Sequence, residues 1–182
     1  MNIGIDIDGC LNSFYKDFYD YILKNYNLKL DIEEYDHTKF LIKNLNIKNI
    51  NDLYKKVSIH DCKPEFLSNF IINKLNKKHN IYIITARDYS EAKQTVQWLE
   101  KYKFNYKDIF FNCGNKNDTC KYLKIDYMID DSPYNIYNLI KDDINTIVFS
   151  RPYNKEFYNG NKVYIANNWI DIYKYIKEKE DT

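Results

Sequence analysis

The chain has 182 residues, 45% of them hydrophobic, which suits one compact domain with room for a small insertion. Its 27 basic and 26 acidic residues are interspersed and give a net charge of +1, which argues against a dedicated polyanion binder, whose basic residues cluster. With only 4 Gly and 3 Pro, a linker-rich or low-complexity chain is also excluded.

The first predicted element is a short buried strand at residues 2–7. A helical pattern of apolar residues follows from Phe14 to Tyr26, and the stretch after it is polar and irregular. We interpret residues 13–62 as a small, mostly helical insertion. The core of the protein would then comprise residues 1–12 and 63–182.

After this insertion, strand and helix patterns alternate regularly. Strands are predicted at residues 81–86, 109–112, 127–130, 146–150 and 162–166, and helices at 64–77, 90–102, 116–124, 133–141 and from 169 onward. In the first of these helices, Phe66, Phe70, Ile71 and Leu75 are expected to face the core. The alternation predicts an α/β fold with a parallel sheet covered by helices on both faces. Ligands bind such sheets at the carboxyl ends of the strands.

The first strand ends in Asp6, Ile7, Asp8 and Gly9. Side chains alternate along a strand, so both carboxylates face one side if the strand persists to residue 8. Gly9 permits a sharp turn or a close approach to a ligand. Taken alone, the two acids could instead stabilise a turn, which is the less favoured alternative.

The next strand ends in Thr85, followed by Ala86 and Arg87. A hydroxyl and adjacent backbone N–H groups can hold a phosphate oxygen. Lys116 begins a short helix, where an anion is favoured and a lysine adds positive charge. Lys121 in the same helix is the alternative lysine, and either could be an ordinary solvated side chain.

The strand at 127–130 ends in adjacent acids, Asp130 and Asp131. Together with Asp6 and Asp8 they would place four carboxylates at one sheet edge, where they would repel one another and raise each other's pKa values. A hard divalent cation removes this conflict. Mg²⁺ prefers oxygen ligands and binds substrate phosphate readily.

This ordered set resembles the haloacid dehalogenase-like phosphatase superfamily, which has DxDG on the first strand, Thr or Ser on the second, then a Lys and a final acidic pair. Within it, "DIDGCLNSF", "IDYMIDDSP", "FSRPYN" and "NNWIDIYKYI" are similar to segments of the 5'(3')-deoxyribonucleotidase family. The resemblance implies a Rossmann-like three-layer α/β/α core, with residues 13–62 as its helical cap.

The resemblance also implies roles for four residues. Asp6 would be the nucleophile that forms an aspartyl-phosphate. Asp8 would protonate the leaving alcohol and then deprotonate the attacking water. Thr85 and Lys116 would hold the phosphoryl oxygens.

The same resemblance implies a Mg²⁺ site made by Asp6, the backbone carbonyl of Asp8, and Asp130 or Asp131, with no choice made between the last two. On the substrate side, Ala86 and Arg87 follow the phosphate-binding Thr85.

Phe14 aligns with a family phenylalanine that lines the base pocket, although a first-turn core aromatic is an equal alternative. Tyr35 and Phe40 of the cap are further candidates. "TAR" in place of a "TSP"-like motif, and Ser13 in place of an acid, leave base and sugar preference open.

The sequence thus predicts a Mg²⁺-dependent phosphomonoesterase for nucleoside monophosphates, with 5'(3')-deoxyribonucleotides as the expected substrates. The alternatives are a phosphatase for a sugar phosphate or a polynucleotide 3'-phosphate, and a non-catalytic nucleotide-binding regulator. The four cysteines lack metal-site spacing and are expected to be reduced thiols of a cytoplasmic protein. No signal peptide, membrane segment or long nucleic-acid partner is expected, and a homodimer stays open.

Overall fold

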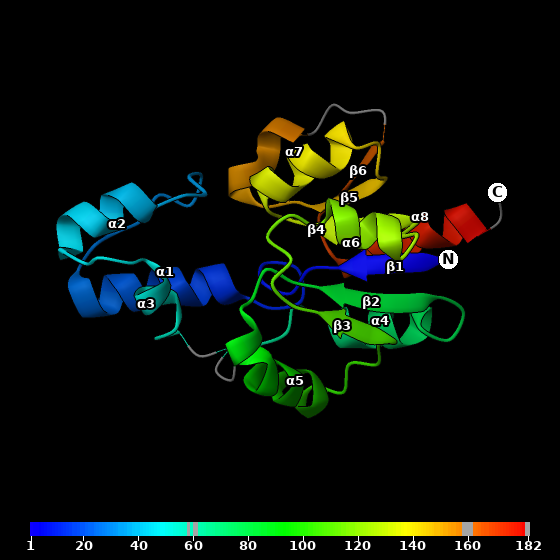
Figure 1. The fold of residues 1–182 in the computed structure, drawn as a ribbon, viewed down its shortest axis with the longest axis horizontal. Coiled ribbons are helices and arrows are strands. Elements are labelled where there is room, and N and C mark those ends of the chain that lie inside the picture. The colour runs from blue at the N-terminus through cyan, green and yellow to red at the C-terminus, as the bar shows by residue number, and fades with distance from the viewer. Residues whose placement is uncertain (58, 60–61, 158–161, 181–182) are drawn as a thin grey trace.

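The computed structural model describes residues 1–57, 59, 62–157 and 162–180. Its centre is a six-stranded sheet in the order β3-β2-β1-β4-β5-β6, in which every neighbouring pair is parallel (Figure 1). The strands are β1 (Asn2–Ile5), β2 (Asn80–Ile84), β3 (Asp108–Phe110), β4 (Tyr127–Asp130), β5 (Thr146–Phe149) and β6 (Val163–Ala166). The predicted parallel α/β fold is confirmed.

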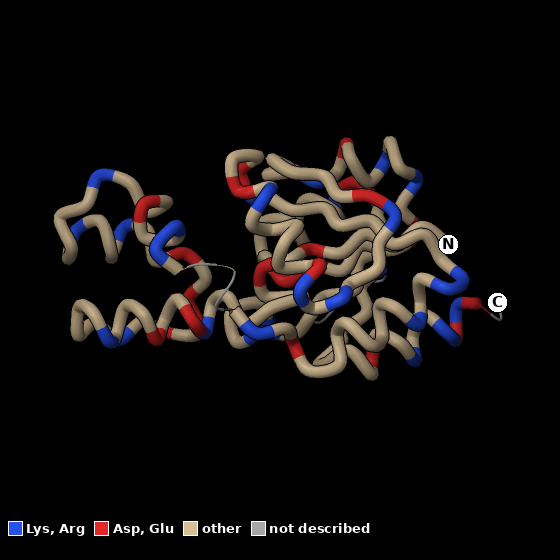
Figure 2. The backbone as a smooth tube through the Cα atoms, turned by 90° about the horizontal axis from the view of Figure 1, so that it is seen from below, with Lys and Arg blue, Asp and Glu red and all other residues tan. Residues whose placement is uncertain are grey.

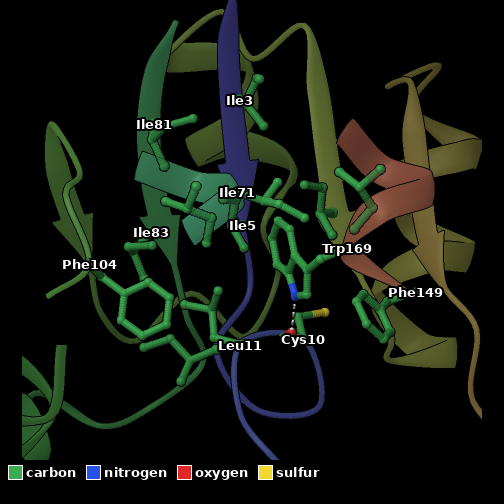
Figure 3. Packing of buried hydrophobic residues seen from close by; sticks show 14 of the residues in the cluster. Ile3, Ile5, Cys10, Leu11, Ile71, Ile81, Ile83, Phe104, Phe149 and Trp169 are labelled. Atoms are coloured by element: carbon green, nitrogen blue, oxygen red, sulfur yellow. Dashed lines mark hydrogen bonds between the residues drawn. The ribbon is translucent and has the colours of Figure 1, made fainter. Parts of the chain in front are cut away.

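Helices cover both faces of this sheet. They are α4 (Ser68–Leu75), α5 (Ala92–Lys101), α6 (Asn117–Tyr122), α7 (Pro133–Lys141) and α8 (Trp169–Glu180). Because side chains alternate along a strand, Ile81 and Ile83 of β2 join the apolar cluster with α4, α5 and α8 (Figure 3). Tyr82 and Ile84 join the cluster with α6 and α7 on the other face. The sheet is therefore the middle of three layers.

Three further helices follow the first strand: α1 (Phe14–Tyr26), α2 (Thr38–Leu45) and α3 (Asn51–Tyr54). They lie beyond the carboxyl end of β1, at the opposite end of the molecule from the N-terminus (Figure 1). They share an apolar cluster of their own, with Phe18, Ile22, Leu41 and Leu53 buried in it. This arrangement agrees with a helical cap inserted after the first strand. The exact division at residues 13–62 stays a prediction, and residues 58 and 60–61 lie outside the described part.

The first strand is shorter than predicted. It ends at Ile5, and the chain turns at once, with the backbone N–H of Leu11 donating to the carbonyl of Ile7 at 2.8 Å. Gly9 has φ +84°, a left-handed conformation that favours glycine. A Cβ atom there would lie 2.1 Å from Oδ2 of Asp131. Glycine is therefore needed for both the turn and the close approach to the acidic pair.

The helix predicted from Pro64 is also different. Glu65 donates its N–H to the carbonyl of Leu11 at 2.8 Å, so this segment pairs with the turn after β1. Leu67 has φ +63°, and α4 begins only after it. Phe66 and Phe70, expected inside, are 79% and 62% exposed. The apolar spacing predicted one long helix because a local sequence pattern carries no information on the pairing of Glu65 with the distant turn.

The C-terminal helix fastens the turn after β1. The indole N–H of Trp169, at the start of α8, donates to the carbonyl of Cys10 at 3.0 Å (Figure 3). Basic and acidic positions are interspersed along the chain (Figure 2). Within the described residues, none of the helices combines the length and apolar character needed to cross a bilayer.

Candidate active site

The site lies where the strand order reverses. β1 and β4 are neighbours, but the chain continues from β1 to β2 on one side and from β4 to β5 on the other. Loops that diverge in this way open a crevice at the carboxyl ends of the two strands. Asp6 directly follows β1, and Asp130 and Asp131 stand at the end of β4. Sheet topology therefore brings together acids that are more than a hundred residues apart.

These three acids form a buried cluster. Carboxylate oxygens of Asp6, Asp130 and Asp131 all lie within 4.8 Å of one another. Lys116, only 1% exposed, places its Nζ 2.7 Å from Oδ1 of Asp6 and 2.7 Å from Oδ2 of Asp130. Lys121, the alternative lysine, instead pairs with Asp142 at the surface. The structure thus brings Lys116 to the acids, and not Lys121.

The cluster carries more negative charge than Lys116 can balance. Burial raises the pKa of Asp6 to about 7; Lys116 opposes this shift, and Asp130 adds to it. Burial, followed by the charges of Asp6 and Asp130, also raises the pKa of Asp131 well above its usual range. Burial alone would lower the pKa of Lys116, but Asp130 and Asp6 more than offset it and raise that pKa. Three carboxylates and one ammonium leave two negative charges, which a divalent cation would neutralise.

Asp8 is not one of these three acids, but its charge adds to the rise in the pKa of Asp6. Oδ1 of Asp8 accepts hydrogen bonds from Nη2 of Arg87 at 2.7 Å and from Nδ2 of Asn12 at 3.1 Å. Thr85, which follows β2, accepts the backbone N–H of Arg87 on its hydroxyl at 3.2 Å. The shared face of Asp6 and Asp8 was predicted on the condition that the strand persists to residue 8. The strand ends at Ile5, so this condition is not met, and the carboxylate of Asp8 pairs with Arg87.

A pocket of about 430 Å³ opens beside Asp8, between the cap helices and the loop after β2. Phe14, Ala86 and Arg87 line it, as does Tyr35 of the cap. The Arg87 guanidinium lies 5.6 Å from the centre of the Phe14 ring. Phe14 also belongs to the buried cluster of the cap, so it is a core aromatic that lines this pocket. That the pocket receives the base stays a prediction. Phe40, 42% exposed on α2, does not line the pocket.

A family-wide sequence model matches residues 1–180 of the chain, and its family is described as 5' nucleotidase, deoxy (pyrimidine), cytosolic type C. The chain belongs to this family. The protein is accordingly a phosphoric monoester hydrolase of the 5'-nucleotidase type, as the resemblance of its motifs predicts.

Individual relatives agree with this membership. A nucleotidase of Clostridium acetobutylicum is 28% identical over 180 residues, covering 95% of this chain and 92% of that protein. A haloacid dehalogenase-like hydrolase from Streptococcus pneumoniae superimposes with a TM-score of 0.67 at 16% identity, over 97% of this chain and 98% of the other. A haloacid dehalogenase-like hydrolase from Xanthomonas campestris gives 0.63 at 11%, over 98% and 95%. The two structures show the fold alone.

Other side chains around the acids were not anticipated from the sequence. Asp130 accepts from the backbone N–H of Ser132 at 2.9 Å and from Nδ2 of Asn135 at 3.2 and 3.3 Å. Asp131 accepts from the hydroxyl of Tyr153 and, at 3.6 Å, from the thiol of Cys10. Asn135 lies in the first turn of the helix that follows the acidic pair, so its position in the sequence could have indicated a contact with Asp130. The other two contacts depend on loops that only the tertiary fold brings together.

Proposed function

We propose that this nucleotidase hydrolyses nucleoside monophosphates, with 5'(3')-deoxyribonucleotides preferred, in a Mg²⁺-dependent reaction that passes through a phosphate ester on Asp6. The observation that carries this proposal is the buried network of Asp6, Lys116, Asp130 and Asp131, next to a pocket large enough for a nucleoside. A surface turn would have no need to bury three carboxylates.

The three acids are a fitting site for Mg²⁺, since they are oxygen donors with uncompensated charge. Asp6, Asp130 and Asp131 would hold the ion with the backbone carbonyl of Asp8. The bound ion would offset the negative charge of the phosphoryl group. The ammonium of Lys116 lies against Asp6, so it is close enough to share that task when a phosphoryl group sits there.

The chain's own residues would carry the reaction in two steps. In the first, a carboxylate oxygen of Asp6 attacks phosphorus, the bond from phosphorus to the substrate alcohol breaks, and Asp8 gives that alcohol a proton. In the second, Asp8 takes a proton from water as the water oxygen attacks phosphorus. The bond between Asp6 and phosphorus then breaks, and inorganic phosphate leaves. The hydroxyl of Thr85 would hold a phosphoryl oxygen.

The pocket supports a nucleoside as the leaving group. Phe14 and Tyr35 offer aromatic faces, and Arg87 offers hydrogen-bond donors for a base or sugar. Along the described backbone, basic positions are interspersed with acidic ones (Figure 2), which argues against a long polynucleotide as the substrate. We propose that residues 13–62 act as the cap over a core of residues 1–12 and 63–182, so that the substrate enters between them.

A phosphate-release assay would test this function. The panel contains deoxyribonucleoside and ribonucleoside monophosphates with 5' or 3' phosphates, sugar phosphates and a 3'-phosphorylated oligonucleotide, each with Mg²⁺ and with a chelator. We expect Mg²⁺-dependent turnover, highest for a deoxyribonucleotide, and none with Asp6→Asn. Turnover that is fastest on a sugar phosphate or the oligonucleotide would overturn the substrate assignment. Tight nucleotide binding without any turnover would favour a regulator.

We also propose that the enzyme works in the cytoplasm. Cys10, Cys62, Cys113 and Cys120 are all buried and form no disulfide bond in the described structure, a state that a reducing compartment preserves. Its partner there would be the small-molecule nucleotide, and size-exclusion chromatography would decide between a monomer and a homodimer.

A further inference from the structure

The segment after β5 contacts both acidic loops of the site, yet the chemistry above gives it no role. We name residues 151–154 the RPYN segment. Arg151 donates from Nε to the carbonyl of Gly9 at 2.9 Å. Asn154 donates from Nδ2 to the carbonyl of Asp131 at 2.8 Å, and Tyr153 donates its hydroxyl to Oδ2 of the same residue. One short segment therefore joins the loop after β1 to the loop after β4.

Within this segment, Tyr153 is the residue that touches a carboxylate of the cluster. Its ring is held on two sides, with ring centres 5.5 Å from Tyr15 and 5.2 Å from Tyr35. The hydroxyls of Tyr15 and Tyr35 are 3.0 Å apart, which ties these two rings together. Tyr153 is 8% exposed and Asp131 is 1% exposed. The hydroxyl is thus fixed in place by packing and has a buried carboxylate oxygen as its acceptor.

The carboxylate of Asp131 is confined on another side by Gly9. An added Cβ at that position would lie 2.1 Å from Oδ2, so the carboxylate packs directly against the turn. Asp6 and Asp130 lie close enough to repel it, and an unrestrained side chain would turn away from them. A donor on Oδ2 opposes that movement. Partners of this kind orient metal ligands and strengthen metal binding.

We propose that Tyr153 is a positioning residue for the metal site, which holds the Asp131 carboxylate in the cluster before the cation arrives. This inference rests on the Mg²⁺ site of the proposed function. It also links that site to the cap, since Tyr15 and Tyr35 pack on Tyr153 and line the pocket beside Asp8.

The test is a calorimetric titration of metal-stripped full-length protein with Mg²⁺. Tyr153→Phe removes the donor and keeps the ring that packs on its two neighbours. We expect Mg²⁺ to bind about 10-fold more weakly, or weaker still. Tyr82→Phe is the matched control, because it removes the same atom from a tyrosine that is 7% exposed and belongs to the apolar cluster with α6 and α7. Its Mg²⁺ affinity should equal that of the wild type.

The melting temperature of each metal-free variant separates positioning from folding. If Tyr153→Phe loses stability but keeps the wild-type Kd for Mg²⁺, the residue is structural and the proposal is wrong. Unchanged or tighter binding by a stable Tyr153→Phe also overturns it. If the wild type binds no Mg²⁺, or if Asp131→Asn binds it as tightly as the wild type does, the proposed metal site itself is wrong, and the role of Tyr153 falls with it.

Discussion

Lys116 has two carboxylates at the same 2.7 Å distance, and a third acid nearby that it does not pair with. A buried lysine destabilises the fold unless a negative charge pairs with it. Here Lys116 pairs with two carboxylates, so the negative charge exceeds the positive charge. The carboxylates of Asp6, Asp130 and Asp131 therefore repel one another within the folded protein. Burial raises the pKa of Asp6 to about 7; Lys116 opposes this shift, and the charges of Asp130 and Asp8 add to it.

This raised pKa predicts how the metal-free protein responds to pH. The usual value for Asp is 3.8, so the native state holds this proton more tightly than the unfolded chain does. The stability that protonated Asp6 contributes is fully present below about pH 4 and is lost as the pH rises to about 7. In chelator, the melting temperature should fall across this window. The fall should be smaller for Asp6→Asn, and an equal fall in both proteins would contradict the assignment.

At the scale of elements, Glu180 at the end of α8 forms a hydrogen bond with His79, the residue before β2. Glu180 accepts from Nε2 of His79 at 2.8 Å and also pairs with Lys177. These hydrogen bonds, that of Lys177 first, lower its pKa from 4.5 to about 2. The stability it contributes is therefore present above about pH 4.5 and lost as the pH falls to about 2. Glu180→Gln should lower the melting temperature at pH 7 but not near pH 2. A deficit that persists at low pH would contradict this.

The elements also show how far the sequence alone could lead. The helix beginning at Pro133 was predicted with its observed bounds, because Pro133 is a local start signal; the structure adds Ser132 as the N-cap, whose side chain accepts from the backbone N–H of Asn135. Asp6, Lys116 and the acidic pair were predicted as one site because sheet topology gathers strand ends. Phe66 was wrongly predicted to face the core. The residue before it, Glu65, pairs with the distant turn after β1, and the local pattern does not show this pairing. Tyr153 was found only in the structure for the same reason.

At the scale of the whole molecule, the site lies between the apolar clusters of the core and the apolar cluster of the cap. The clusters on the two faces of the sheet hold the strand ends, and a separate cluster holds the cap helices. Phe14 belongs to the cap cluster and also lines the pocket beside Asp8. The cap should therefore govern how well a nucleotide is held, while the sheet governs the acids and Lys116.

Leu41→Ala tests whether the cap controls nucleotide binding more than it controls metal binding. Leu41 on α2 is fully buried in the cap cluster, and removing its side chain should cost about 2–5 kcal/mol of cap packing. Because the pocket depends on the cap, the KM for a nucleotide should rise. The Kd for Mg²⁺ should change less than the KM does, since the acids stand at the ends of β1 and β4 and the cap cluster reaches them indirectly, through the packing of Tyr15 on Tyr153. Ile136→Ala, an equally buried position on α7, is the matched control and should leave the KM closer to the wild type. A loss of metal affinity as large as the rise in KM would mean that the cap controls the metal site as strongly as it controls the pocket.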